Sequence, residues 1–249
     1  MGMASSQAGS CCWKLFKKTT MGMHTMVYIS ANNRKVAIVG VGGAGCNVVS
    51  QFYKAQCGVD TIAINTDKDG LHAASAGRKI YICKEVLHGE GAYGETEIGK
   101  KCADIHIEEI KEALSGYDMV FVVSGLGGGT GTGATPVVIE AAQSQNIRTF
   151  AIAIKPFFFE GDRVAIAKEG YSRIRAVCPY ATMIENDIIV SKLSDKTMDE
   201  AFAEVNTSIM GHIEACICKY DDHNDDAAFV DDGFDSFVKT SPLCAFISA

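Results

Sequence analysis

Short apolar runs alternate with amphipathic segments along most of the chain. The apolar runs are rich in valine and isoleucine, as buried strands are, and lie near 35–40, 60–65, 79–83, 118–124, 148–154 and 181–186. Segments with helical periodicity fill the intervals and lie near 44–56, 68–76, 97–115, 135–146, 162–177 and 197–219. Because strands and helices alternate, the pattern predicts an α/β fold: a Rossmann-like, three-layer domain built on a parallel sheet.

The segment near 197–219 predicts one long helix at the end of this unit. Thr197 and Glu200 have the spacing of a capping box. An apolar stripe at helical spacing follows and comprises Met198, Phe202, Val205, Ile209, Ile213, Cys216 and Ile217. We therefore expect one face of this helix to belong to the core.

A glycine run from Gly127 to Gly133, interrupted only by Thr130 and Thr132, follows the predicted strand near 118–124. Glycine permits φ > 0 and close approach of the backbone, so such a run can turn several N–H groups toward an anion. Pro136 stands near the start of the predicted helix that follows, where proline is tolerated. A helix N-terminus behind a glycine loop predicts a phosphate site.

A second glycine loop follows the first predicted strand. Gly40, Gly42 and Gly45 match the dinucleotide fingerprint, which by itself indicates either a tight turn or an NAD-dependent oxidoreductase. NAD alone leaves residues 127–133 without a role. Neither loop is a Walker A motif, because no Gly-Lys-Ser/Thr follows either of them. Two loops together indicate a ligand with several phosphates.

These motifs resemble the tubulin/FtsZ family of GTPases, most strongly prokaryotic FtsZ. The resemblance rests on the run at 127–133, the opening loop at 40–47, and the blocks at 61–67, 91–99, 155–161 and 186–187. It covers the chain from Arg34 to Lys219. We accordingly expect an extension or disordered segment at 1–33, a GTP-binding domain at 34–219 that ends in the central helix of the family, and a divergent acidic tail at 220–249. The resemblance also predicts that most of the family's second domain is absent.

The resemblance implies GTP or GDP as the ligand, with Mg²⁺ as its companion ion. Asn65 and Asp67 correspond to the segment that approaches the γ-phosphate and the water shell of the ion, and Glu160 and Arg163 to the ribose and phosphate contacts. The implied GTP-binding residues are Gly42, Gly43, Asn47, Asn65, Asp67, Gly128, Gly129, Thr130, Gly131, Thr132, Glu160, Arg163, Asn186, Phe202 and Asn206.

Guanine selection is assigned to Asn186, Phe202 and Asn206. An amide can meet both donors and acceptors on the guanine edge, and Phe202 offers a stacking face. Asn206 lies four residues after Phe202, so both project from one side of the predicted helix. A solvent-facing amide is the alternative for Asn206.

Family members hydrolyse GTP between subunits with carboxylates from a loop after the central helix. Asn224 and Asp226 are the catalytic candidates here, but Phe229 stands where a second aspartate belongs. The alternative is a solvated acidic tail with accidental similarity. The resemblance thus implies a self-associating GTPase with a role in cell division or membrane constriction. The alternative is a non-hydrolysing GTP-binding regulator or cap that binds a full-length FtsZ-like homologue.

The formal charge of −7 argues against general nucleic-acid affinity. The ten cysteines lack the spacing of a disulfide framework or a zinc site, so we expect reduced thiols, no metal centre and a cytoplasmic protein. No apolar run reaches the length of a membrane span. Residues 1–18 fit a loose myristoylation pattern with nearby lysines, which makes them the one candidate for membrane attachment. The alternatives are a disordered extension and a later start codon.

Overall fold

A computed structural model describes the chain from residue 35 to residue 217, with gaps. The described residues are 35–55, 58–187, 197, 200, 203, 205–207, 209–213, 216 and 217, without the side chain of Glu85. The predicted extension at 1–33 and the predicted tail at 220–249 lie outside them.

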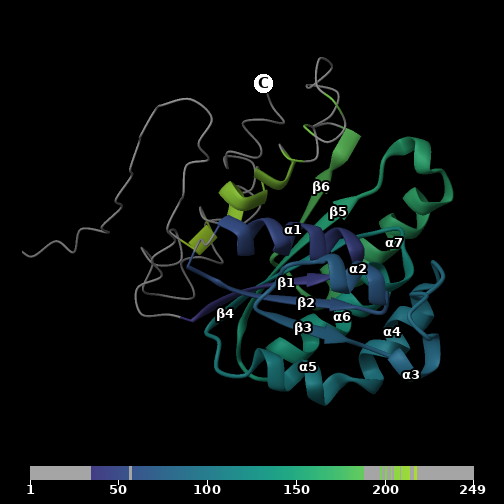
Figure 1. The fold of residues 1–249 in the computed structure, drawn as a ribbon. Coiled ribbons are helices and arrows are strands. Elements are labelled where there is room, and N and C mark those ends of the chain that lie inside the picture. Colours follow the sequence, from purple (N-terminus) through teal and green to yellow (C-terminus); the bar gives the residue numbers. More distant parts are fainter. Residues whose placement is uncertain are drawn as a thin grey trace, which may run out of the picture.

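The centre of the fold is a parallel sheet of six strands in the order β3-β2-β1-β4-β5-β6 (Figure 1). The strands are β1 (Val36–Val41), β2 (Asp60–Asn65), β3 (Arg78–Tyr81), β4 (Met119–Gly125), β5 (Arg148–Lys155) and β6 (Ala181–Glu185). Most of their residues are buried, as expected for strands that helices cover on both faces. The predicted α/β class and the parallel sheet are confirmed.

Helices connect the strands in the alternation that the sequence predicts. They are α1 (Gly42–Ala55), α2 (Lys68–Ala73), α3 (Lys84–Leu87), α4 (Thr96–Ile105), α5 (Ile107–Leu114), α6 (Gly129–Gln143), the short 3-10 helix η1 (Phe158–Glu160) and α7 (Asp162–Val177). The predicted helix near 68–76 ends earlier, at Ala73, and the predicted strand near 79–83 ends at Tyr81.

The helices form two layers, one on each face of the sheet. Side chains of α4, α5, α6 and α7 pack on one face, against β-strand residues such as Val39 and Val122. On the other face, α1 packs against Ile38 and Phe121, and the helical residues Val205, Ile209 and Ile213 join the same cluster. The result is the predicted three-layer arrangement.

Helix α6 differs from its prediction. The predicted helix near 135–146 begins close to Pro136, whereas the observed helix begins at Gly129 and contains Pro136 in its interior. Tertiary packing overrides the low helix propensity of glycine here. A Cβ atom on Gly133 would overlap the carbonyl oxygen of Thr96, so this glycine allows α4 to lie close against α6.

The predicted helix near 97–115 is in fact two helices, α4 and α5, which meet at His106. The backbone of His106 leaves the helical region, at φ −98° and ψ 20°. Its Nε2 atom accepts a hydrogen bond of 2.8 Å from the backbone N–H of Cys83, and its Nδ1 lies 3.1 Å from Glu109 Oε2. A tertiary contact therefore fixes the break.

The described residues near the end of the chain support the predicted helix near 197–219. Residues 200, 203, 205–207, 209–213, 216 and 217 are helical. The backbone N–H of Thr197 donates to Glu200 Oε2 at 2.7 Å, and the backbone N–H of Glu200 donates to Thr197 Oγ1 at 3.3 Å. This reciprocal pair is the predicted capping box.

Replacement of Thr197 by alanine should lower the free energy of unfolding by about 1 kcal/mol, because it removes the side-chain acceptor of this cap. Urea unfolding of both proteins would measure the difference. Thr207→Ala is the control, since among the described residues the Thr207 hydroxyl donates to the Ala203 carbonyl within the helix. Equal losses for the two variants would contradict a specific capping role.

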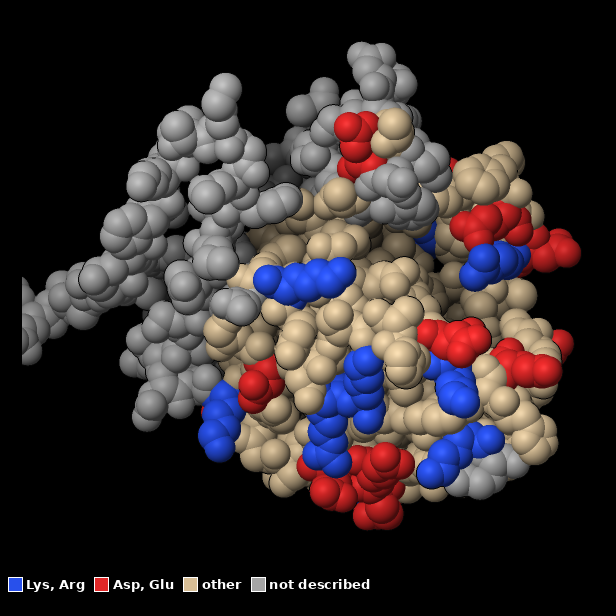
Figure 2. All heavy atoms as spheres, in the orientation of Figure 1, with Lys and Arg blue, Asp and Glu red and all other residues tan. Residues whose placement is uncertain are grey.

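On the face that Figure 2 shows, basic and acidic side chains are mixed, and neither kind forms a region of its own. Blue and red groups alternate across it, among larger tan areas. None of the described helices is long and apolar enough to cross a bilayer.

Candidate nucleotide-binding site

The site lies at the carboxyl edge of the sheet, where the connections from β1 and β4 leave in opposite directions. β1 and β4 are neighbours, with Gly40 opposite Val123 and Val41 opposite Ser124. β1 leads into α1 on one face and β4 leads into α6 on the other. Ligands of open α/β sheets bind at such a switch point, because the diverging loops leave a crevice.

Several glycines in these two loops are required by packing within the chain. Gly42 has a φ of +73°, and a Cβ atom there would lie 2.9 Å from the backbone nitrogen of Gly131. A Cβ atom on Gly131 would overlap the carbonyl oxygen of Gly125. The loops therefore contact each other through backbone, which brings the N-terminal ends of α1 and α6 to one place.

Gly43 and Gly128 differ from these packing glycines. Within the part of the chain that the structure describes, a Cβ atom on Gly43 would have no neighbour within 4 Å, and one on Gly128 would meet Arg163 Nη2 at 3.5 Å. Both residues line a cavity of about 930 Å³. Since two helix N-termini with glycine backbone open onto it, this end of the cavity suits phosphate groups.

Most of the predicted binding residues line the cavity. They are Gly42, Gly43, Asn65, Asp67, Gly128, Gly129, Thr130, Gly131, Glu160, Arg163 and Asn186. These residues come from five separate segments of the chain, which the fold brings together around one cavity.

Asp67 has a structural role as well as its place in the wall. Its Oδ1 accepts a hydrogen bond of 2.7 Å from the backbone N–H of Gly70 and caps α2. Asn65 Oδ1 accepts from the backbone N–H of Thr66 at 2.9 Å and from that of Asp67 at 3.3 Å. The side-chain amide of Asn65 thus holds the turn that carries the Asp67 carboxylate.

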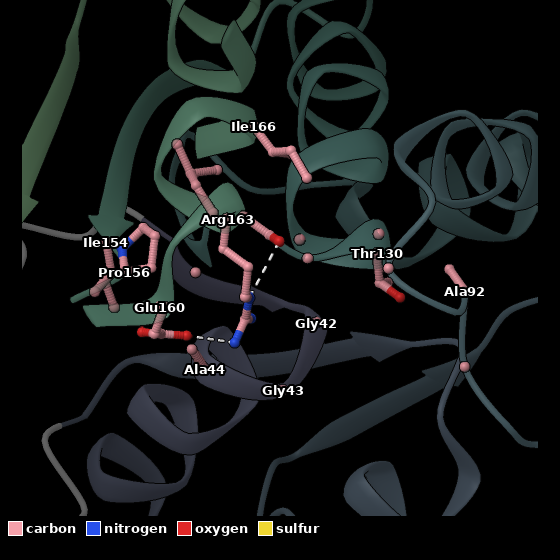
Figure 3. Close-up of a pocket in the computed structure, with 18 of the residues that line it drawn as sticks. Gly42, Gly43, Ala44, Ala92, Thr130, Ile154, Pro156, Glu160, Arg163 and Ile166 are labelled. Carbon is pink, nitrogen blue, oxygen red and sulfur yellow. Dashed lines mark hydrogen bonds and ion pairs between the residues drawn. The ribbon is translucent and has the colours of Figure 1, made fainter. Parts of the chain in front are cut away.

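Arg163 and Glu160 form an ion pair at the cavity wall. Figure 3 shows Arg163 extending from α7 toward the start of α1, with dashed lines to Glu160 and to the glycine loop. Arg163 Nε donates to the carbonyl oxygen of Gly127 at 3.2 Å. Glu160 Oε1 also accepts from the backbone N–H of Phe157 at 2.9 Å, so the carboxylate orders the η1 turn.

Apolar side chains and one buried amide also line the cavity, beside the charged Lys155, Glu160 and Arg163 of the same segments. Ile154, Pro156, Phe157, Phe159 and Ile166 contribute to its lining. Asn186 also lines it and is only 7% exposed, yet its Oδ1 has no hydrogen-bond partner among the described residues. Such an atom carries a desolvation cost that a ligand donor would remove.

The mouth of the cavity holds residues that the predicted binding set does not include. Tyr93 is 60% exposed, has a φ of +50° and donates from its hydroxyl to Glu90 Oε2 at 2.7 Å. This hydrogen bond raises the pKa of Tyr93. Both residues line the cavity. The sequence offered no motif for Glu90, which reaches the site because Asp67 and Glu90 form an isolated bridge.

Other predicted binding residues do not line the cavity. Asn47 is exposed on α1, and Thr132 is buried, where its hydroxyl accepts from the backbone N–H of Gly127 at 2.9 Å. Asn206 is helical and half-buried. Phe202, Asn224 and Asp226 lie outside the described residues.

The fold and the cavity can be compared with those of known proteins. Residues 35–194 match the family described as "Tubulin/FtsZ family, GTPase domain". The sequence is 38% identical over 187 residues to the "Cell division protein FtsZ" of Buchnera aphidicola, an alignment that covers 74% of this chain and 49% of that protein. It is 41% identical over 180 residues to FtsZ of Aquifex aeolicus, which covers 71% of this chain and 49% of that protein. The chain thus spans about half the length of these relatives.

Solved structures agree with the sequence match. An empty FtsZ dimer from M. jannaschii superposes with a TM-score of 0.70 at 34% identity, covering 75% of this chain and 55% of that one. A protofilament of CetZ2 from Haloferax volcanii with GTPγS bound gives a TM-score of 0.68 at 26% identity. The match covers 80% of this chain and 62% of the CetZ2 chain. From the order of its strands, its two glycine loops and these matches, the chain belongs to the tubulin/FtsZ family and contains its GTPase domain.

Proposed function

We propose that this chain binds GTP and GDP in the cavity between α1 and α6, self-associates, and hydrolyses GTP between subunits. The observation that carries the proposal is a single cavity lined both by two glycine-flanked helix N-termini and by apolar side chains with the buried Asn186 amide. The helix N-termini suit phosphates, and the apolar side chains with the amide suit a planar base with hydrogen-bonding edges.

Guanine selection would depend on Asn186. Its unpartnered Oδ1 is an acceptor, and the N1–H and exocyclic amino groups of guanine are donors. Adenine presents an acceptor at N1 and has no amino group at C2, so it could not offer the acceptor this pair of adjacent donors. Asn206 remains the second proposed contact, with Phe202 as the proposed stacking face.

Mg²⁺ would accompany the triphosphate. Asp67 and Glu90 supply carboxylate oxygens at the phosphate side, and a magnesium ion held by a nucleotide commonly uses one or two carboxylates together with phosphate oxygens. The ion would neutralise charge on the phosphates. The protein would hold the γ-phosphate through backbone N–H groups and position the attacking water, with Asn224 and Asp226 of a neighbouring subunit as the proposed source of the catalytic groups.

Replacement of Asn186 by alanine should weaken GTP binding roughly tenfold, because it removes one buried hydrogen-bond acceptor for guanine. Calorimetric titration of the full chain with GTP, GDP and ATP would measure affinity and selectivity. Gln51→Ala is the control, since Gln51 is exposed on α1 and does not line the cavity. An Asn186→Ala variant with wild-type preference for GTP over ATP would refute the assignment.

A non-hydrolysing regulator or cap of a full-length FtsZ-like filament is the second candidate. The observation in its favour is Phe229, which occupies the place of a catalytic aspartate. GTP turnover measured against protein concentration separates the two. Specific activity that rises with concentration supports catalysis between subunits, whereas tight GTP binding without turnover supports a regulator. An NAD titration in the same series tests the oxidoreductase alternative.

A further inference from the structure

Two buried hydroxyl groups connect the Asp67 turn to the start of α6. Thr66 Oγ1 lies 2.6 Å from Thr130 Oγ1, although the two residues are 64 positions apart. Thr66 is fully buried between Asn65 and Asp67, and Thr130 lies in the first turn of α6, 9% exposed. Of these two threonines, Thr130 lines the cavity and Thr66 lies behind it.

The surroundings of the two hydroxyls determine the direction of this hydrogen bond. Among the described residues, Thr66 Oγ1 has Thr130 Oγ1 as its hydrogen-bond partner. If Thr130 donated to Thr66, the proton of the buried Thr66 hydroxyl would lack an acceptor, which costs free energy. If Thr66 donates to Thr130, its proton is satisfied and the Thr130 proton is directed to another acceptor. Because Thr130 lines the cavity, that acceptor would lie in the cavity.

The other threonine hydroxyls of α6 are engaged within the chain. Thr132 Oγ1 accepts from the backbone N–H of Gly127 at 2.9 Å, and Thr135 Oγ1 donates to the carbonyl oxygen of Gly131. Neither residue lines the cavity. Thr130 is therefore the α6 threonine that can present a hydroxyl proton to a ligand in this cavity.

We propose that Thr66 is a positioning residue that donates its hydroxyl proton to Thr130 and so directs the Thr130 proton at a phosphate oxygen of the bound nucleotide. The inference rests on the proposed function, because it requires a phosphate at the α6 end of the cavity. A hydroxyl that accepts a hydrogen bond is a stronger donor in turn, since hydrogen bonds in a chain polarise one another. Thr66 also holds the Asp67 turn against α6 through the same contact.

Thr66→Val tests this role, because valine keeps the shape of threonine and removes the hydroxyl. We expect affinity for GTP and GDP to fall roughly fivefold, and affinity for guanosine, which lacks phosphate, to stay unchanged. Thr66→Ser, which restores the donor, should return the nucleotide affinities to near wild type. Titrations of the full chain with the three ligands, together with unfolding curves for each variant, provide the measurements.

A double-mutant cycle with Thr130→Val adds a readout that a general packing defect would not move. Once Thr130 has lost its hydroxyl, Thr66→Val should cause little further loss of GTP affinity. Additive losses, an equal loss for guanosine, or wild-type GTP affinity in Thr66→Val would each overturn the inference. A wild-type chain that binds no guanine nucleotide would instead refute the proposed function. If Thr66→Val does not fold, Thr66→Cys replaces it, and its weak S–H donor should give an intermediate loss.

Discussion

Replacement of Gly131 by alanine is expected to abolish nucleotide binding and to lower the free energy of unfolding by about 3 kcal/mol. A Cβ atom at this position would overlap the carbonyl oxygen of Gly125 and lie 3.4 Å from that of Val41. The overlapping atom belongs to the backbone at the end of β4, so no side-chain rotation can relieve the overlap. The start of α6 would have to move away from the sheet, and the phosphate end of the cavity would open.

Gly43→Ala is the matched control for this substitution. Gly43 also lines the cavity, but a Cβ atom there has no neighbour within 4 Å among the described residues. The free energy of unfolding of the Gly43→Ala protein should stay within about 1 kcal/mol of the wild-type value. Urea unfolding and GTP titration of both variants would provide the comparison. A Gly131→Ala protein of wild-type stability would contradict the close approach of α6 to β4.

Acidification should destabilise the fold through His212. This side chain is 1% exposed, and burial lowers its pKa from 6.5 to about 4. Because the pKa is lower in the folded protein than in the unfolded chain, the neutral histidine favours folding above pH 6.5. This contribution is lost as the pH falls toward 4, and the loss between pH 7 and pH 5 should be about 2 kcal/mol.

His212→Leu isolates this contribution from that of the carboxyl groups. Leucine has a similar volume to histidine and does not titrate. Ile209 and Ile213, which lie near position 212 in the sequence, belong to the buried apolar cluster that α1 forms with the sheet. Unfolding free energies of both proteins at pH 7, 6 and 5 should show a steeper decline for the wild type. Parallel curves would mean that His212 is protonated as readily in the fold as in the unfolded chain. Cys216 Sγ, 3.8 Å from His212 Nε2, is the nearby polar group to consider in a repacked variant.

The sequence predicted the layers and the strand ends well because both follow from local patterns. Apolar runs of strand length place β1 to β6 within a few residues of their observed bounds. The start of α6 and the break at His106 were missed for one common reason. In each case a contact with a distant segment, Thr96 or Cys83, determines the backbone.

In the candidate site, too, local patterns were predicted from the sequence and contacts between distant segments were not. The glycine spacing predicted a phosphate site, and the resemblance to the tubulin/FtsZ family added Asn65, Asp67 and Asn186, which line one cavity with residues 42–43 and 128–131. No sequence pattern distinguished the packing glycines from the open ones. Thr132 belongs to the glycine run by sequence, yet its hydroxyl supports the loop from behind.

The sequence by itself determined the α/β class and the edge of the sheet where a phosphate would bind, because periodicity and glycine spacing act over a few residues. The family followed from the resemblance of several short motifs. Only the tertiary structure decided that Thr66 meets Thr130, that Glu160 pairs with Arg163 and that Asn186 is buried at the cavity. These contacts join segments that are far apart in the sequence, and the order of the residues does not specify the distances between such segments. Folding brings those segments together through the hydrophobic packing of the two helix layers on the sheet.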